Sequence, residues 1–345
     1  MRALKIAVEE HMADPGTVDN TKGLFDGRPW MRDYLLNVQG QLLADMDAAG
    51  IEMSILSLSA LGIQGIPARK QAVEAAQRAN DYLAEQVARN PKRFQGFAAL
   101  PMQDPDAAAR ELARCVNELG FRGALVNGFS QVDTEHSAVY LDMPQYWDFW
   151  GTVESLDVPF YLHPRDPLPG WTPFLDGHPW FMAARLAFTI ETSSHALRLM
   201  ASGLFDKYPK LTIVLGHLGE TIPNQIWRID HRIAVMPPKG IPAKKKLDEY
   251  FRNNFYVTTS GNYCTPTFMN TVQWMGTDRV LFAVDFPFEK VNEAVQWFDN
   301  LDVINETDWN KIARTNAEKL FKLNTPSEPI KTDCNVNPKN EKEFS

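Results

Sequence analysis

Eight short apolar runs alternate with helix-compatible segments along most of this 345-residue chain. Runs of this length and composition are typical of strands that are buried on both faces. They cover residues 4–8, 53–58, 94–100, 123–127, 158–162, 211–215, 255–259 and 280–284. Strands that alternate with helices form parallel sheets, and eight such units predict a (β/α)8 barrel. A doubly wound sheet is the alternative, but the first run is not followed by a glycine-rich phosphate-binding turn.

The segments between the runs agree with a barrel. Residues 70–89 and 106–119 are amphipathic at helical spacing, and Asp104-Pro105 supplies an N-cap followed by a first-turn proline. We expect one catalytic domain over residues 1–323, with extended loops after the first and fifth strands. Residues 324–345 are rich in Pro, Lys, Asn and Glu, so we expect a tail that is mobile or lies on a partner subunit.

Charge and cysteine content exclude several function classes. The net charge is −8 and no basic run is long, which argues against a nucleic-acid partner. Three cysteines without metal-like spacing cannot build a disulfide framework, so we expect a cytoplasmic protein. Apolar stretches of about 18 residues do not occur, and no membrane span is predicted.

Polar side chains stand at the carboxyl ends of the predicted strands, where a barrel carries its active site. The first run is followed by Glu9-Glu10-His11. Side chains alternate across a strand, so Glu9 and His11 point to one face and Glu10 to the other. A carboxylate and an imidazole on one face make half of a divalent-metal site, whereas a buried ion pair is the structural alternative.

Other strand ends supply further donors. His163 follows the fifth run, His217 the sixth and Asp285 the eighth, and Glu220 is spaced to accept the second ring N–H of His217. Taken singly, these residues could be hydrogen-bonded core histidines or a helix cap. A closed barrel brings them together with the first-strand pair. Such a set of carboxylates and imidazoles suits Zn²⁺ or Mn²⁺.

Candidate substrate contacts are weaker predictions. Asn127 ends the fourth run and could line the pocket or satisfy loop backbone. Arg228 could clamp an anionic oxygen, and a surface salt bridge with Asp230 or Glu220 is the alternative. Three apolar residues could form a wall for an aromatic substrate or simply pack in the core: Leu24, Phe25 and Phe288.

Together these motifs resemble a known superfamily. The Glu-x-His of the first strand, YLHPR at the fifth, GHLGE at the sixth and the terminal Asp of the eighth resemble the amidohydrolase superfamily. Its hydrolases carry His-x-His at the first strand, and Glu9 in the first position is similar to its metal-dependent decarboxylase branch. Strings such as FAALPMQDPDAAARELARCVNELGFRGALVNGFSQ extend the resemblance over residues 4–323.

The resemblance implies one divalent metal ion, Zn²⁺ or Mn²⁺, and no organic cofactor. Glu9, His11, His163 and Asp285 would bind the ion. Asp285 would also donate a proton, with His217 and Glu220 beside it. Arg228, Leu24, Phe25, Asn127 and Phe288 would face the substrate.

The implied reaction is non-oxidative decarboxylation of a small aromatic acid, 2,6-dihydroxybenzoate, to resorcinol and CO₂ by a homotetramer, reversible at high bicarbonate. Salicylate and 2,3-dihydroxybenzoate are alternative substrates. A metal-dependent hydrolase and a non-catalytic metal-binding protein are alternatives of other classes. Glu9 in place of histidine argues against the hydrolase, as does the absence of a lysine late in the fourth strand.

Overall fold

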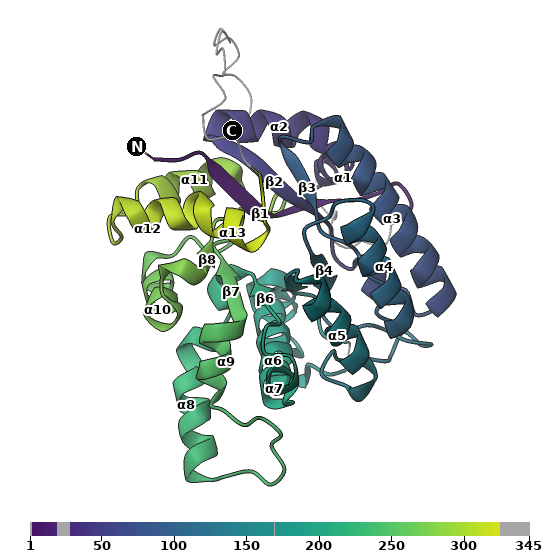
Figure 1. Ribbon diagram of the computed structural model, residues 1–345, viewed down its shortest axis with the longest axis vertical. Helices are drawn as coiled ribbons and strands as arrows, with labels where there is room; N and C mark the ends of the chain where they lie inside the picture. Colours follow the sequence, from purple (N-terminus) through teal and green to yellow (C-terminus); the bar gives the residue numbers. More distant parts are fainter. Residues whose placement is uncertain (1, 19–27, 169, 325–345) are drawn as a thin grey trace, which may run out of the picture.

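The computed structural model describes residues 2–18, 28–168 and 170–324, and it confirms the predicted barrel (Figure 1). Eight parallel strands lie inside a layer of helices. The strands are β1 Lys5–Met12, β2 Ile51–Leu58, β3 Phe94–Gly96, β4 Ala124–Asn127, β5 Phe160–His163, β6 Ile213–Leu215, β7 Phe255–Thr258 and β8 Val280–Leu281. The predicted wall residues Leu24 and Phe25 and the predicted tail lie outside the described residues, apart from Asn324.

Helices follow the strands along the chain. The first group is α1 Trp30–Leu36, α2 Leu43–Ala49, α3 Arg69–Arg89, α4 Pro105–Asn117, α5 Trp147–Leu156, α6 Ala187–Ala201 and α7 Leu204–Lys207. The second is α8 Ile222–Val235, α9 Leu247–Asn254, α10 Thr265–Met275, α11 Val291–Asp299, α12 Glu306–Asn310 and α13 Asn316–Leu320. The Asp104 cap is confirmed, because its side chain accepts the Ala107 N–H at 2.9 Å. None of the helices in the part of the chain described above is long and apolar enough to cross a membrane.

Two continuous ladders make up the barrel, in the orders β1-β2-β3 and β4-β5-β6-β7-β8. Single parallel bridges join them, from Ala98 to Ala124 on one side and from Glu10 to Phe286 on the other. Backbone hydrogen bonds reinforce both seams, for example from Val8 N–H to Phe282 O at 3.2 Å. The seam between β1 and β8 therefore lacks a regular ladder, and the metal-site residues of β1 lie on it.

Three strand ends differ from the prediction in a way that matters for the site. β1 continues through His11, so Glu9 and His11 belong to the strand itself, and His163 is likewise the last residue of β5. β8 stops at Leu281, so Asp285 lies four residues beyond it in a loop. Cross-strand partners explain the first result, since His11 pairs with Ser57 of β2 in register.

Side chains from alternate strand positions fill the barrel. Ile6, Val8, Leu125, Tyr161 and Val214 belong to this interior cluster, and all are buried. A larger apolar layer packs the outer face of the strands against the helices. Both strand faces are therefore buried, as the near-continuous apolar runs indicate.

Candidate metal centre and active site

Four side chains from three barrel segments converge at the carboxyl ends of the strands. Glu9 and His11 come from β1, His163 from β5 and Asp285 from the loop after β8. One donor atom from each lies within 4.8 Å of every other, and all four residues are buried. Donors at 2.0–2.2 Å from a central ion stand up to about 4.4 Å apart, so this cluster has nearly the size of a metal shell.

Three of the donor atoms have no hydrogen-bond partner within the described chain. Glu9 Oε1, His11 Nε2 and Asp285 Oδ1 are buried and have no hydrogen-bond partner, although His11 Nε2 and Asp285 Oδ1 lie only 3.1 Å apart. A buried polar atom without a partner costs about 1–3 kcal/mol. Three of them aimed at one point fit a divalent cation, which would satisfy all three at once.

Hydrogen bonds on the far side of each imidazole orient its free nitrogen. His163 Nδ1 lies 2.9 Å from the carbonyl oxygen of Pro164 and His11 Nδ1 lies 3.0 Å from Ser57 Oγ. The His163 contact requires a proton on Nδ1, which leaves Nε2 as a lone-pair donor. Burial, reinforced by the charge of His11, holds the pKa of His163 well below its usual value. A neutral imidazole is the form that binds a metal.

Three hydroxyl groups hold the second oxygen of Glu9. Tyr161, Thr258 and Ser260 all donate to Oε2, with Thr258 at 3.0 Å. This arrangement leaves Oε1 as the free oxygen. The sequence reasoning missed Tyr161 and Thr258. The usable signal was their alternation, since Tyr161 precedes His163 by two residues and shares its face.

We expect Tyr161→Phe to weaken metal binding by about 10- to 100-fold, because the carboxylate of Glu9 loses a hydroxyl that orients it. Titration of the apoprotein with Mn²⁺ in a calorimeter measures the change. Tyr146→Phe is the matched control, since that buried hydroxyl donates to Met102 O in another part of the barrel. Equal Mn²⁺ affinity in wild type and Tyr161→Phe would show that the hydroxyl does not orient Glu9.

His217 stands beside the cluster in a turn of unusual backbone geometry. His217, Leu218, Gly219 and Glu220 all have positive φ, between 53° and 81°. Such backbone is costly for side-chain-bearing residues and is found where a site needs it. The turn brings His217 Nδ1 to 2.7 Å from Glu220 Oε1, the contact that their spacing predicts. His217 Nε2 then points at Asp285 Oδ2, 3.6 Å away.

The charges around this pair determine where the proton resides. Burial lowers the pKa of His217, but Glu220, Glu9 and Asp285 outweigh it and raise that pKa well above the usual value. Burial raises the pKa of Asp285, but His11 and His217 outweigh it and hold that pKa below the usual value. The expectation that Asp285 itself keeps a proton near neutral pH thus runs against the electrostatics of the site. Both shifts favour a proton on the imidazole of His217 over one on the carboxylate of Asp285.

The predicted substrate contacts divide into two groups. Asn127 ends β4 in register with His163, and its Oδ1 is buried without a partner. The Phe288 ring meets the His11 ring edge-on, with centroids 5.6 Å apart. Both therefore border the cluster.

Arg228 is placed differently. It lies exposed on α8, next to the exposed Trp227, and makes no ion pair within the described chain. The surface salt bridges considered for it are absent there, because Asp230 instead accepts the backbone N–H groups of Leu247 and Asp248 at 2.9 Å.

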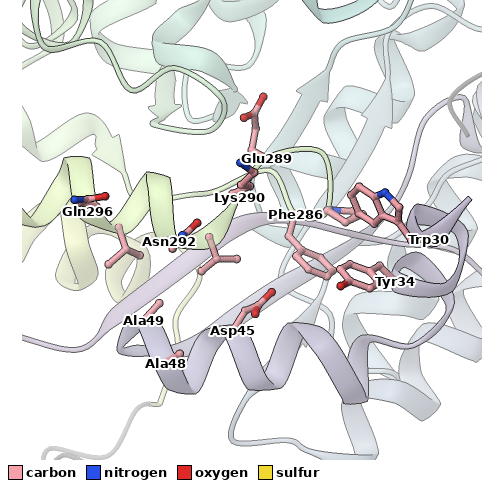
Figure 2. Close-up of a pocket in the computed structure, with 13 residues that line it drawn as sticks. Trp30, Tyr34, Asp45, Ala48, Ala49, Phe286, Glu289, Lys290, Asn292 and Gln296 are labelled. Carbon is pink, nitrogen blue, oxygen red and sulfur yellow. The ribbon is translucent and has the colours of Figure 1, made fainter. Parts of the chain in front are cut away.

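A cavity of about 500 Å³ borders the loop that carries Asp285, at the residues that follow Asp285 in the chain (Figure 2). Trp30 and Tyr34 of α1, Asp45 of α2, and Phe286 and Glu289 of the loop are among its lining residues. The ligand donors are not part of this lining. The loop after β8 therefore carries Asp285 of the metal cluster and borders this cavity through the residues that follow.

Fold and site together define a barrel enzyme with a candidate divalent-metal site of mixed carboxylate and imidazole donors. The chain belongs to the amidohydrolase family, whose model matches residues 33–323.

Within that family the chain is similar to several decarboxylases. It is 55% identical over 322 residues to the gamma-resorcylate decarboxylase of Rhizobium radiobacter, covering 92% of this chain and 98% of the relative. It superposes with a TM-score of 0.90 on the crystal structure of a 2,6-dihydroxybenzoate decarboxylase complexed with 2,6-dihydroxybenzoate, at 53% identity, covering 94% and 100% of the two chains. The dihydroxybenzoic acid decarboxylase of Polaromonas sp., with bound manganese and 2-nitroresorcinol, gives the same TM-score and identity, covering 94% and 98%.

Proposed function

We propose that this protein catalyses the non-oxidative, metal-dependent decarboxylation of 2,6-dihydroxybenzoate to resorcinol and CO₂. The observation that carries the proposal is the convergence of Glu9, His11, His163 and Asp285, with three free donor atoms, in a chain 55% identical to a gamma-resorcylate decarboxylase. Glu9 supports decarboxylation over hydrolysis, since the hydrolases have histidine there.

The chemistry follows from the residues around the cluster. A divalent ion held by the four ligands supplies Lewis-acid stabilisation of negative charge on substrate oxygens. Asn127 and Phe288 border the cluster, so we assign them to the carboxylate side and the ring of the substrate respectively. Holding the ring in one orientation is itself a large contribution to rate.

A proton must reach the ring carbon that bears the carboxylate, because direct loss of CO₂ would leave an aryl carbanion. His217 Nε2 holds this proton, and Asp285 Oδ2 receives it and delivers it to the ring carbon. The C–CO₂ bond then breaks, its electron pair restores the aromatic ring, and CO₂ leaves. Glu220 keeps His217 oriented through the bond to Nδ1. Because the free energy of decarboxylation is small enough for mass action to reverse it, we expect the reverse carboxylation at high bicarbonate.

Several finer points belong to the same proposal. We assign Mn²⁺ as the resident metal, with Zn²⁺ as the alternative, because a relative of 53% identity binds manganese and this ligand set suits both. No organic cofactor is required by this chemistry. We further propose one domain over residues 1–323 and a cytoplasmic location.

A homotetramer is also part of the proposal. Trp171, Trp180 and Phe181 of the β5–α6 loop are exposed, as are Trp227 and Met236 at α8. Exposed aromatic residues of this number favour association between copies. Arg228 follows Trp227 on α8 and is likewise exposed, so we propose that it contacts substrate from that subunit interface.

Arg228→Ala is expected to raise KM by about 10- to 100-fold, through the loss of a charge-assisted hydrogen bond to the substrate, and to leave the Mn²⁺ affinity unchanged. Initial rates over a range of 2,6-dihydroxybenzoate concentrations measure KM. Arg232→Ala, one turn further along α8, is the matched control. A KM within about twofold of wild type in Arg228→Ala would contradict the assignment.

One assay tests the function itself. The Mn²⁺-loaded and Zn²⁺-loaded protein is incubated with 2,6-dihydroxybenzoate, 2,3-dihydroxybenzoate and salicylate. A lactone and an amide are included as hydrolase substrates. We expect CO₂ and resorcinol from the first compound at the highest kcat/KM. A higher kcat/KM for another hydroxybenzoate would contradict the proposed substrate. Hydrolysis without decarboxylation would contradict the proposed reaction. Bound metal without turnover of any of them would overturn the proposal.

A further inference from the structure

Glu10 is a buried carboxylate that the mechanism leaves without a role. It is 1% exposed, and its side chain points away from Glu9 and His11. It forms no ion pair with a cationic side chain of the described chain. A carboxylate buried without a counter-charge is costly unless hydrogen bonds replace its hydration. The partners it does have therefore indicate what it is for.

Those partners are two backbone amides on either side of Asp285. The Val284 N–H donates to Glu10 Oε1 at 2.9 Å, and the Phe286 N–H donates to Oε2 at 3.1 Å. Both oxygens are used as acceptors, one for each amide. The Asp285 N–H between them donates to Glu9 O at 2.9 Å. Three successive N–H groups of this loop are thus held by two adjacent residues of β1.

The loop is also held through its carbonyl groups, since the His11 N–H donates to Phe286 O at 2.8 Å and the Tyr263 hydroxyl donates to Val284 O at 2.8 Å. The amides of Val284 and Phe286, in contrast, have Glu10 as their acceptor. The regular ladder of β8 ends at Leu281, four residues earlier. Asp285 has φ of +82°, a conformation that side-chain-bearing residues rarely adopt. On the side facing α1 and α2 the loop borders the 500 Å³ cavity, where Tyr34 stacks on Phe286 (Figure 2). The Glu10 carboxyl group therefore supplies the acceptors for the two amides that flank Asp285, in a stretch beyond the end of the regular β8 ladder.

We propose that Glu10 is a positioning residue that holds Asp285 in the conformation needed for metal binding and proton delivery. Its two carboxyl oxygens offer an acceptor to each amide, which the amide isostere cannot do. A glutamine has one carbonyl oxygen, and its NH₂ group would face the other backbone N–H. The tripeptide Glu9-Glu10-His11 thus acts on both faces of β1. Glu9 and His11 bind the metal, and Glu10 holds the backbone on either side of the third ligand segment, which carries Asp285.

The kinetic consequences of this inference rest on the proposed function. Its consequences for the arrangement of the metal ligands rest on geometry alone. In Glu10→Gln, Asp285 shifts relative to the other ligands while Asn127, at the end of β4, remains in place. We expect kcat per bound Mn²⁺ to fall about 10- to 100-fold with KM changed by less than about threefold, the size of effect that outer partners of ligands have. The Mn²⁺ EPR spectrum should change, since it reports ligand symmetry independently of turnover.

Two comparisons separate positioning from general stability. Glu52→Gln is the matched control, because Glu52 is a buried carboxylate of β2 that binds Arg314 and does not contact the loop. It should keep the wild-type EPR spectrum and kcat. In the background of Asp285→Asn, Glu10→Gln should have little further effect on Mn²⁺ affinity, since a residue acting through Asp285 is not additive with it. If Glu10→Gln does not fold, Glu10→Asp, which keeps the carboxyl group but is one methylene shorter, is measured in the same way.

The outcomes are distinct. A wild-type EPR spectrum and kcat per bound Mn²⁺ in the Glu10 variant would overturn the inference, and so would full additivity with Asp285→Asn. A wild-type protein that binds Mn²⁺ but turns over no hydroxybenzoate would overturn the proposed function instead. In that case the EPR and affinity measurements still decide the role of Glu10.

Discussion

Asp285→Asn is expected to reduce kcat for 2,6-dihydroxybenzoate by at least about 10³-fold. The amide can neither accept the proton from His217 nor pass it to the ring carbon, and general acid catalysis contributes about 10²–10⁴ in rate. The substitution also exchanges a charged metal ligand for a neutral one, so Mn²⁺ affinity falls as well. Rates are therefore measured at saturating Mn²⁺ and divided by the bound metal.

The control for this variant is Asp278→Asn, an exposed aspartate that pairs with Lys311 away from the strand ends that carry the site. It should retain the wild-type kcat. Asp285→Asn with kcat within about threefold of wild type would remove Asp285 from the proton path. His217 alone would then have to deliver the proton.

Removing the metal is expected to abolish turnover completely and to destabilise the fold. Chelation leaves Glu9, His11, His163 and Asp285 buried without their common partner. A metal that binds only the folded state stabilises it by about 2.7 kcal/mol when the free concentration is 100 times Kd. Thermal unfolding with and without Mn²⁺ measures this gain as a rise in Tm, and added Mn²⁺ should restore the activity.

His163→Ala should lose both the activity and the metal-dependent rise in Tm, because the free Nε2 that its hydrogen bond to Pro164 orients is gone. His178→Ala is the matched control, since that histidine is exposed in the β5–α6 loop. A rise in Tm with Mn²⁺ that is as large in His163→Ala as in wild type would exclude His163 as a ligand.

The ligand set illustrates how far pattern reasoning reaches. Alternation along β1 predicts that Glu9 and His11 share one face. Because the carboxyl ends of parallel strands meet at one rim of a barrel, the sequence also predicts that His163 lies near them. The His217–Glu220 contact also follows from local spacing. These relations depend on strand period and barrel topology, which the order of residues encodes directly.

Other features depend on residues far apart in sequence, and only the folded chain reveals them. Tyr161, Thr258 and Ser260 come from two strands to reach one oxygen of Glu9. The positive φ of Asp285 and the low pKa of its carboxyl group depend on the surroundings that β1 and the His217 turn create. The exposure of Arg228 is likewise a property of how α8 sits against its neighbours.

The sequence by itself predicted the barrel and the candidate metal ligands, because strand periodicity and residue type are local and repeat along the chain. Its resemblance to a known family predicted the class of chemistry. The tertiary structure decided which oxygen of Glu9 is free, in which direction the pKa values of His217 and Asp285 shift, and which amides the Glu10 carboxyl group holds. Those properties arise from distances and burial among segments up to 276 positions apart, as in the bond between Phe286 N–H and Glu10.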